Sequence, residues 1–120
     1  MYNNIYPITN EVAFEVTSQL SNEDKRECIE GHGLDPFTLA MEVLSTPDSY
    51  YFKAPNGMSA AIGGAEPNGR IWLLCTDTVR QYPLTFTRNI KKFVDSRPEK
   101  LLWNVVDKRN TTHIKLLRFL

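Results

Sequence analysis

The chain has 120 residues, of which 42% are hydrophobic, so it can build one globular domain with a single core but not two. No stretch approaches the about 20 consecutive apolar residues that cross a bilayer, and the polar start MYNN lacks a signal-peptide pattern, so we expect a soluble, intracellular protein. Cys28 and Cys75 fit neither a disulfide framework nor a metal-ligand spacing, which predicts free thiols and no metal.

The formal net charge is zero, yet the charge is unevenly distributed along the sequence. Residues 1–79 carry 4 Lys and Arg against 11 Asp and Glu, whereas residues 80–120 carry 10 against 3, so the two parts have charges of −7 and +7. The simplest interpretation is two oppositely charged faces of one domain. The alternative is a basic surface for phosphate, acidic protein or nucleic acid, but the sequence has no long basic run of the kind that marks a nucleic-acid patch.

The first third of the chain predicts a strand followed by helices. Residues 3–9 form a first or edge strand, because Pro7 cannot donate to a ladder. Asn10 is the expected cap of a first helix, and residues 21–30 read as an exposed, acidic helical turn that Gly31 and Gly33 end. The apolar positions of that first helix recur at helical spacing: Ala13, Val16 and Leu20.

The segment LDPFTLAMEVLS has the clearest helix start in the sequence, with Asp35 as the cap and Pro36 at the first helical position. Its apolar residues predict one buried face, because a stripe of Phe and Met is far more often core than a cofactor site. The expected members of that face are Phe37, Ala40, Met41 and Leu44.

Two identical tripeptides, Pro55-Asn56-Gly57 and Pro67-Asn68-Gly69, then mark turns. The segments SYYFKA, MSAAIGGAE and RIWLLCT around them predict three antiparallel strands joined by two hairpins. Gly63-Gly64 in the middle strand indicates a bulge or a close backbone approach.

The pattern then changes to helical periodicity, and it predicts an amphipathic helix over residues 83–96 with Phe86, Ile90, Phe93 and Val94 facing the core. The apolar segment Leu101–Val106 is typical of an interior strand, and a strand, a helix and a second strand of this kind make a right-handed crossover. We therefore expect IWLLC and LLWNVV to be parallel neighbours, with Asn110 capping a final helix.

This order of elements resembles the GNAT N-acetyltransferase superfamily, which implies an α/β (α+β) fold with a mainly antiparallel sheet and one parallel strand pair. Trp103-Asn104, Asn110-Thr111-Thr112-His113-Ile114 and Leu117, with Gly63-Gly64 and Trp72 upstream, look more specifically like the GNAT-like internal virion proteins of short-tailed bacteriophages. The motifs cover roughly residues 60–120, and the first half fits by element order alone.

The resemblance implies that acetyl-CoA, if bound, would lie along Leu74, Cys75, Thr76, Arg80, Thr85 and Asn110. GNAT enzymes cradle its pyrophosphate in a glycine-rich turn, whereas residues 77–85 contain no glycine, Tyr82 is bulky and Pro83 lacks a donor. The expected general acid falls on Leu117, which cannot donate a proton. No catalytic residue is therefore assigned.

The remaining polar candidates have simpler structural explanations. Asn110 fits a plain helix cap as well as it fits a pantetheine contact. His113 is more often a packing residue on the apolar side of a helix, and His32 in a glycine break is expected to be exposed. Glu66, at the end of the middle strand, could lie where some transferases have a general base, but its position at a hairpin end is the better explanation.

Two further strands normally follow the last helix of a GNAT fold, and the sequence stops where they would begin. We therefore expect either a longer native chain or a partner that covers the Leu101–Val106 strand, through self-association or another virion protein.

Three functions follow. The first is a phage virion or assembly protein that acts through protein contacts in the virion or host cytoplasm, without a cofactor. The second is an acetyl-CoA-dependent N-acetyltransferase. The third, with the least support, is nucleic-acid binding through Arg88, Lys91, Lys92 and Arg97.

Overall fold

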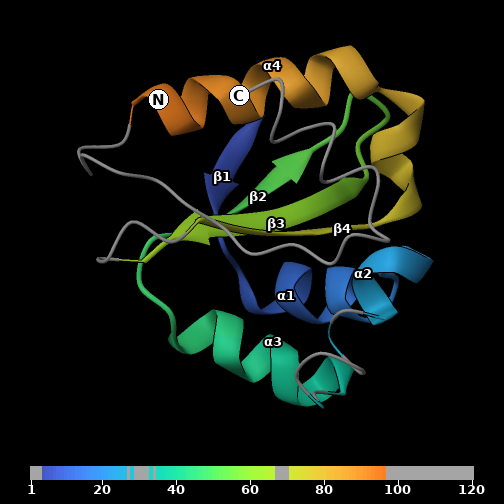
Figure 1. Ribbon diagram of the computed structural model, residues 1–120, viewed down its shortest axis with the longest axis vertical. Helices are drawn as coiled ribbons and strands as arrows, with labels where there is room; N and C mark the ends of the chain where they lie inside the picture. Colours follow the sequence, from blue (N-terminus) through green and yellow to red (C-terminus); the bar gives the residue numbers. More distant parts are fainter. Residues whose placement is uncertain (1–3, 27, 29–32, 34, 67–70, 97–120) are drawn as a thin grey trace.

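The computed structural model describes residues 4–26, 28, 33, 35–66 and 71–96 of the 120. Figure 1 shows three layers: helix α4 on one face of a sheet, the sheet itself, and helices α1, α2 and α3 on the other face. In chain order the elements are β1 (Ile5–Pro7), α1 (Asn10–Thr17), α2 (Asn22–Arg26), α3 (Pro36–Ser45), β2 (Ser49–Lys53), β3 (Ser59–Ala65), β4 (Ile71–Cys75), the 3-10 helix η2 (Asp77–Gln81) and α4 (Pro83–Asp95).

The sheet has the strand order β1-β2-β3-β4, and each neighbouring pair is antiparallel. The expected α+β class and the three-stranded meander are therefore confirmed, and β1 is an edge strand in which Pro7 pairs with Tyr50. No parallel pair occurs within the described residues. The strand expected to form one, Leu101–Val106, lies outside them, as do the second turn at Pro67-Asn68-Gly69 and the final helix.

The turn between β2 and β3 forms as the sequence predicts. The backbone N–H of Gly57 donates to the carbonyl of Ala54 at 2.9 Å, and that of Ala54 donates to the carbonyl of Met58 at 2.8 Å. Gly57 has a φ of 87°, a conformation that residues with a Cβ seldom adopt. The register of the hairpin shifts between Phe52 and Lys53, whose partners are Ala61 and Ser59. Ala60 is therefore the extra residue, so the bulge lies in β3 but not at the paired glycines.

Gly63 and Gly64 instead permit a close approach. A Cβ on Gly63 would lie 2.7 Å from the carbonyl oxygen of Trp72, and a Cβ on Gly64 would lie 2.5 Å from that of Asp48 and 3.1 Å from the Trp72 indole nitrogen. Contacts this short do not occur with a real Cβ, so both glycines are required for the Trp72 side chain and the Asp48 turn to pack against β3.

The α1–α3 face of the sheet is packed with small side chains. Val16, Ala13 and Ala40 are fully buried, and they contact Ile62 of β3. Thr9 caps α1, with its hydroxyl accepting from the N–H of Val12 at 3.3 Å, one residue before the predicted cap at Asn10. Short side chains let α1 lie close both to β3 and to α3.

The prediction for the buried face of α3 is wrong for two of its four residues. Asp35 caps this helix and Pro36 begins it, as expected. The buried stripe, however, consists of Leu39, Ala40 and Val43, whereas Phe37 is 67% exposed and Met41 is 50% exposed. Two apolar stripes alternate along this helix, and the contact with α1 selected the one with the smaller side chains.

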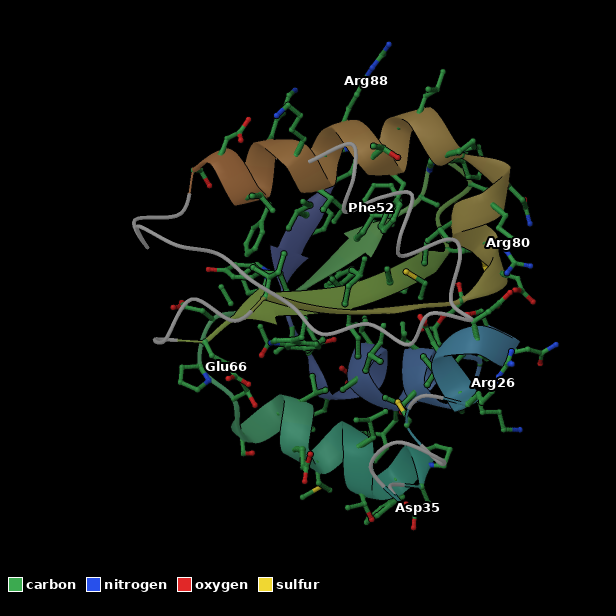
Figure 2. All side chains as sticks on the ribbon, in the orientation of Figure 1. Arg26, Asp35, Phe52, Glu66, Arg80 and Arg88 are labelled. Atoms are coloured by element: carbon green, nitrogen blue, oxygen red, sulfur yellow. The ribbon has the colours of Figure 1, made fainter. Side chains whose placement is uncertain are left out.

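The α4 face is packed with aromatic rings. Phe86 and Phe93 of α4 are buried against Phe52 of β2, with Ile90 and Val94 partly buried beside them, as the helical periodicity predicts. Figure 2 shows Phe52 between the sheet and α4. None of the helices in the described part of the chain is long and apolar enough to cross a membrane.

Candidate functional site

The residues expected to contact acetyl-CoA lie at the carboxyl end of β4 and in the turn that follows it. Leu74, Cys75 and Thr76 close the strand, with Cys75 3% and Thr76 4% exposed. Thr76 remains tied to β3, since its N–H and its hydroxyl both donate to the carbonyl of Ala60 at 2.9 Å. Leu74 pairs with Ile62 in the ladder. The side chains of this strand end are thus part of the core.

The backbone of Cys75 faces the outer edge of β4, because residues paired with β3 and residues facing outward alternate along the strand. Its backbone N–H and carbonyl are both hydrogen-bonded to residues at the start of α2. Its N–H donates to the Asp24 carboxylate at 2.5 Å, and its carbonyl accepts from the N–H of Ser21 at 2.8 Å. These bonds, with the neighbouring bridge between Leu20 and Thr76, attach the start of α2 to the end of β4.

Asp24, whose carboxylate accepts from the Cys75 N–H, is a buried residue. It is only 1% exposed, although the sequence predicted an exposed turn here, and that prediction is wrong at this position. Ser21 caps α2, with its hydroxyl accepting from the Asp24 N–H at 3.4 Å and its carbonyl accepting from the Lys25 N–H at 2.9 Å. The Asp24 carboxylate itself accepts from the N–H of Cys75, and a buried carboxylate needs such a donor to offset its lost hydration.

The thiol of Cys75 is an inert group in this setting. Burial raises its pKa well above the usual range, and the nearby Asp24 carboxylate raises it further. Because the thiolate is the reactive form, the side chain is a poor nucleophile at neutral pH. Cys28 is buried as well, and neither cysteine is in a disulfide, as predicted.

The segment after β4 is a closed 3-10 turn where a GNAT enzyme would have an open, glycine-rich one. Thr76 caps η2 by accepting from the N–H of Thr78 at 3.3 Å, and the N–H of Tyr82 donates back to the carbonyl of Val79 at 3.2 Å. Val79 is 4% exposed and packs in the core with Phe86. The Val79 side chain therefore anchors the turn to the core.

Arg80 is already paired with carboxylates. Its guanidinium lies 2.7 Å from the Glu23 carboxylate of α2 and 3.7 Å from that of Asp77. A hydrogen bond from the backbone N–H of Glu23 itself, opposed in part by desolvation, and the Arg80 guanidinium lower the pKa of Glu23. Figure 2 shows Arg80 at the end of the molecule where Arg26 of α2 also projects.

The start of α4 offers few polar groups to a ligand. Tyr82 makes no side-chain cap bond, and Pro83 has no N–H. Thr85 is half-buried, and its carbonyl accepts from the Asn89 side chain at 2.9 Å. Asn89, which is 6% exposed, is a buried polar residue that the apolar pattern of this helix did not predict.

Glu66 lies away from these residues. It follows β3, whose Ala65 pairs with Ile71 at the amino end of β4, whereas Cys75 lies at the carboxyl end. Figure 2 shows Glu66 and Arg80 at opposite ends of the sheet. The structure therefore brings together Leu74, Cys75, Thr76 and Arg80 but not Glu66, while Asn110, Leu117, His113 and His32 are outside the described residues.

Sequence patterns did not indicate the residues at the start of α2 that contact Cys75 and Arg80, which are Ser21, Glu23 and Asp24. The spacing Ser-x-x-Asp is a signal for a helix start, and it could have indicated the cap at Ser21. Nothing local signals the bond from Cys75 to Asp24, because the two residues are 51 positions apart.

The arrangement has clear chemical consequences. Any ligand that bonded to these backbone groups of Cys75 would have to displace Asp24 and Ser21, and an anion at Arg80 would have to compete with Glu23. Within the described residues, no group of three or more His, Cys, Asp and Glu side chains could hold a metal ion. Comparison with known proteins adds no relative, since no family model, curated protein or solved structure matches the chain.

Proposed function

We propose that this chain is a non-catalytic structural protein, a virion or assembly component of a short-tailed bacteriophage, that acts through protein–protein contacts on an acetyltransferase-like fold. Its place of action is the virion or the host cytoplasm, and its partners are other virion proteins or further copies of itself. The resemblance of Trp103-Asn104 and the Asn110–Ile114 segment to internal virion proteins supports the phage origin.

One observation carries the non-catalytic part of this proposal. The two backbone groups of Cys75 that face the outer edge of β4 are bonded to Asp24 and Ser21 of the same chain. A pantetheine arm binds a strand through such outward-facing groups, so a cofactor would have to replace a charge-assisted hydrogen bond to a buried carboxylate. Breaking that bond would leave Asp24 buried without this donor, which costs free energy.

Two further features support the same conclusion. Val79 anchors the turn that would receive a pyrophosphate to the core, and Arg80 is already paired with Glu23. The described elements also follow the GNAT order of a strand, helices, a three-stranded meander and a helix, with the short α2 as an additional helix. This order supports the fold relationship while the local structure favours loss of the cofactor.

Isothermal titration of the full chain with acetyl-CoA tests the proposal. We expect no saturable heat at micromolar ligand, and we expect mass spectrometry to find no acetylation of amine substrates above background. Micromolar binding that weakens in Arg80→Ala but not in the matched variant Arg88→Ala would contradict the loss of the cofactor site, and acetylation of an amine as well would establish the alternative, an N-acetyltransferase.

The assignment to a virion has its own test. Mass spectrometry of purified particles from the phage that encodes the chain should detect it at a fixed stoichiometry to the other virion proteins. Recovery only in the soluble lysate, with none in the particles, would contradict a structural role in the virion and would leave assembly or another role in the host.

A further inference from the structure

The outer surface of α1 and α3 carries an apolar patch that the core does not use. Phe37 is 67%, Met41 50% and Phe14 36% exposed, and the rings of Phe14 and Phe37 contact each other across the two helices with their centroids 5.6 Å apart. Met41 lies one helical turn from Phe37 on the same side of α3. Exposed aromatic and Met side chains that gather in this way are typical of a contact surface.

Acidic residues surround this patch. Neither α1 nor α3 contains a Lys or Arg, while the two helices and the α3 cap carry carboxylates that are exposed or half-exposed. We call this surface the acidic face, and it consists of Phe14, Phe37 and Met41 with Glu11, Glu15, Asp35 and Glu42. An apolar centre with a rim of one sign selects a partner with a rim of the other sign.

The outer side of α4 has the complementary character. Leu84 is 70% exposed at the start of the helix, and Arg88 and Lys92 follow it at spacings of four residues along the exposed side. Lys91 is paired with Asp95 at 3.4 Å, whereas Arg88 and Lys92 form no ion pair with any described residue. We call Leu84, Arg88, Lys91 and Lys92 the basic ridge.

The two surfaces lie on opposite sides of the molecule. Figure 1 shows α4 and the pair α1 and α3 separated by the sheet, and Figure 2 shows Arg88 pointing away from one side and Asp35 located at the other. A copy of the chain therefore cannot join its own two surfaces, but it can present each of them to a different neighbour.

We propose that the chain associates with further copies of itself head to tail, with the basic ridge of one copy seated on the acidic face of the next. Leu84 is the apolar side chain that contacts Phe37 and Met41, and Arg88 and Lys92 meet the surrounding carboxylates. Since the two surfaces differ, the contact is heterologous, and it builds a ring if the rotation closes and a filament if it does not.

This inference rests on the proposed structural role and names its partner as a second copy of the chain. The test of cofactor binding and the test of self-association are independent, because the proposed contact uses the outer surfaces of the helices and not the end of β4. A chain that bound acetyl-CoA could still associate, and a monomeric chain could still lack a cofactor.

Sedimentation velocity of the full chain at low salt tests the contact. The sedimentation coefficient should rise with protein concentration, and added NaCl to about 0.5 M should reverse the rise because it screens the charged rims. Phe37→Gln/Met41→Gln and Arg88→Gln/Lys92→Gln should each remain monomeric, and Lys25→Gln/Lys53→Gln, which removes two exposed positive charges elsewhere, should associate like the wild type. Far-UV circular dichroism checks that each variant is folded.

Mixing the two defective variants distinguishes a head-to-tail contact from a symmetric one. Each retains one intact surface, so an equal mixture should form a one-to-one dimer that does not grow further. A mixture that remains monomeric would overturn the proposal, as would a wild-type chain that is monomeric throughout. A monomer that binds duplex DNA, with an affinity that Arg88→Gln/Lys92→Gln lowers, would also overturn it and would assign the ridge to nucleic acid.

Discussion

The two faces of the sheet are packed by different means. On the α4 face, aromatic rings meet edge to face, with Phe52 and Phe86 centroids 5.2 Å apart at 61° and Tyr50 and Phe93 centroids 5.4 Å apart at 63°. On the α1–α3 face, Ala13, Val16 and Ala40 are fully buried, and no ring of comparable size is as deeply buried among the described residues there.

This difference determines which kind of substitution destabilises each face. Rings on the α4 face supply the volume between helix and sheet, so their removal leaves a cavity. Small side chains on the α1–α3 face set a short distance from α1 to the sheet and from α1 to α3, so added volume has no space to enter. The same close packing leaves Phe37 and Met41 exposed, since the short residues Ala40 and Val43 form the buried contact with α1.

The largest effect should come from truncating a ring on the α4 face. Phe86→Ala should lower the free energy of unfolding by about 3–5 kcal/mol, because it removes buried apolar area and leaves a cavity beside Phe52 and Val79. Urea denaturation followed by tryptophan fluorescence measures this change. Leu84→Ala, on the same helix but 70% exposed, should change the stability by less than about 0.5 kcal/mol. Equal effects would show that α4 is not packed through its ring face.

The α1–α3 face should respond to the opposite substitution. Ala13→Leu should destabilise the protein by about 1–3 kcal/mol, because Ala13 is 0% exposed between α1 and the sheet. Asn10→Leu, at the exposed start of the same helix, introduces the same side chain and should have little effect. A neutral or stabilising Ala13→Leu would mean that this face contains unfilled space, and the contrast between the two faces would disappear.

The start of α2 is attached to the sheet at the end of β4, and the contacts there are polar. Asp24→Ala should cost about 1–3 kcal/mol, because it leaves the buried N–H of Cys75 without an acceptor. Asp24→Asn retains an acceptor oxygen and should cost less. Equilibrium unfolding of both variants checks the order, and amide hydrogen exchange at Cys75 should accelerate in Asp24→Ala. Equal losses in the two variants would show that the charge, and not the hydrogen bond, is what matters there.

The smallest effect belongs to the surface ion pair that crosses the same junction. Arg80→Ala should cost at most about 1 kcal/mol at neutral pH, because the Arg80 side chain is 48% exposed. The pKa of Glu23 is lowered in the folded protein, so its contribution to stability is present above its usual value of 4.5 and is lost as the pH falls through the lower folded value. Denaturation at several pH values should therefore show wild type and variant converging below pH 4.5. A difference that persists in acid would assign the loss to packing of the Arg80 stem.

The sequence determined those parts of the structure that depend on neighbours along the chain. The Asp35 cap with Pro36, the Pro55-Asn56-Gly57 turn, the period-two strands and the amphipathic helix from Pro83 each follow from local backbone preferences and hydrophobic spacing, and each forms as predicted. The charge division between residues 1–79 and 80–120 was also legible, because it requires only counting.

Contacts between distant segments were decided only by the tertiary structure. Phe37 and Met41 had the correct spacing for a core stripe, but the buried contact with α1 uses Ala40 and Val43 instead. No local pattern states which side of a helix its neighbour covers or how close the two helices lie. Asp24 belonged to an acidic turn that predicts exposure, yet a strand end 51 residues away provides the N–H that makes its burial tolerable. Hydrophobic periodicity reports which residues can be buried together, whereas the available volume and the remaining hydrogen-bond partners select which of them are.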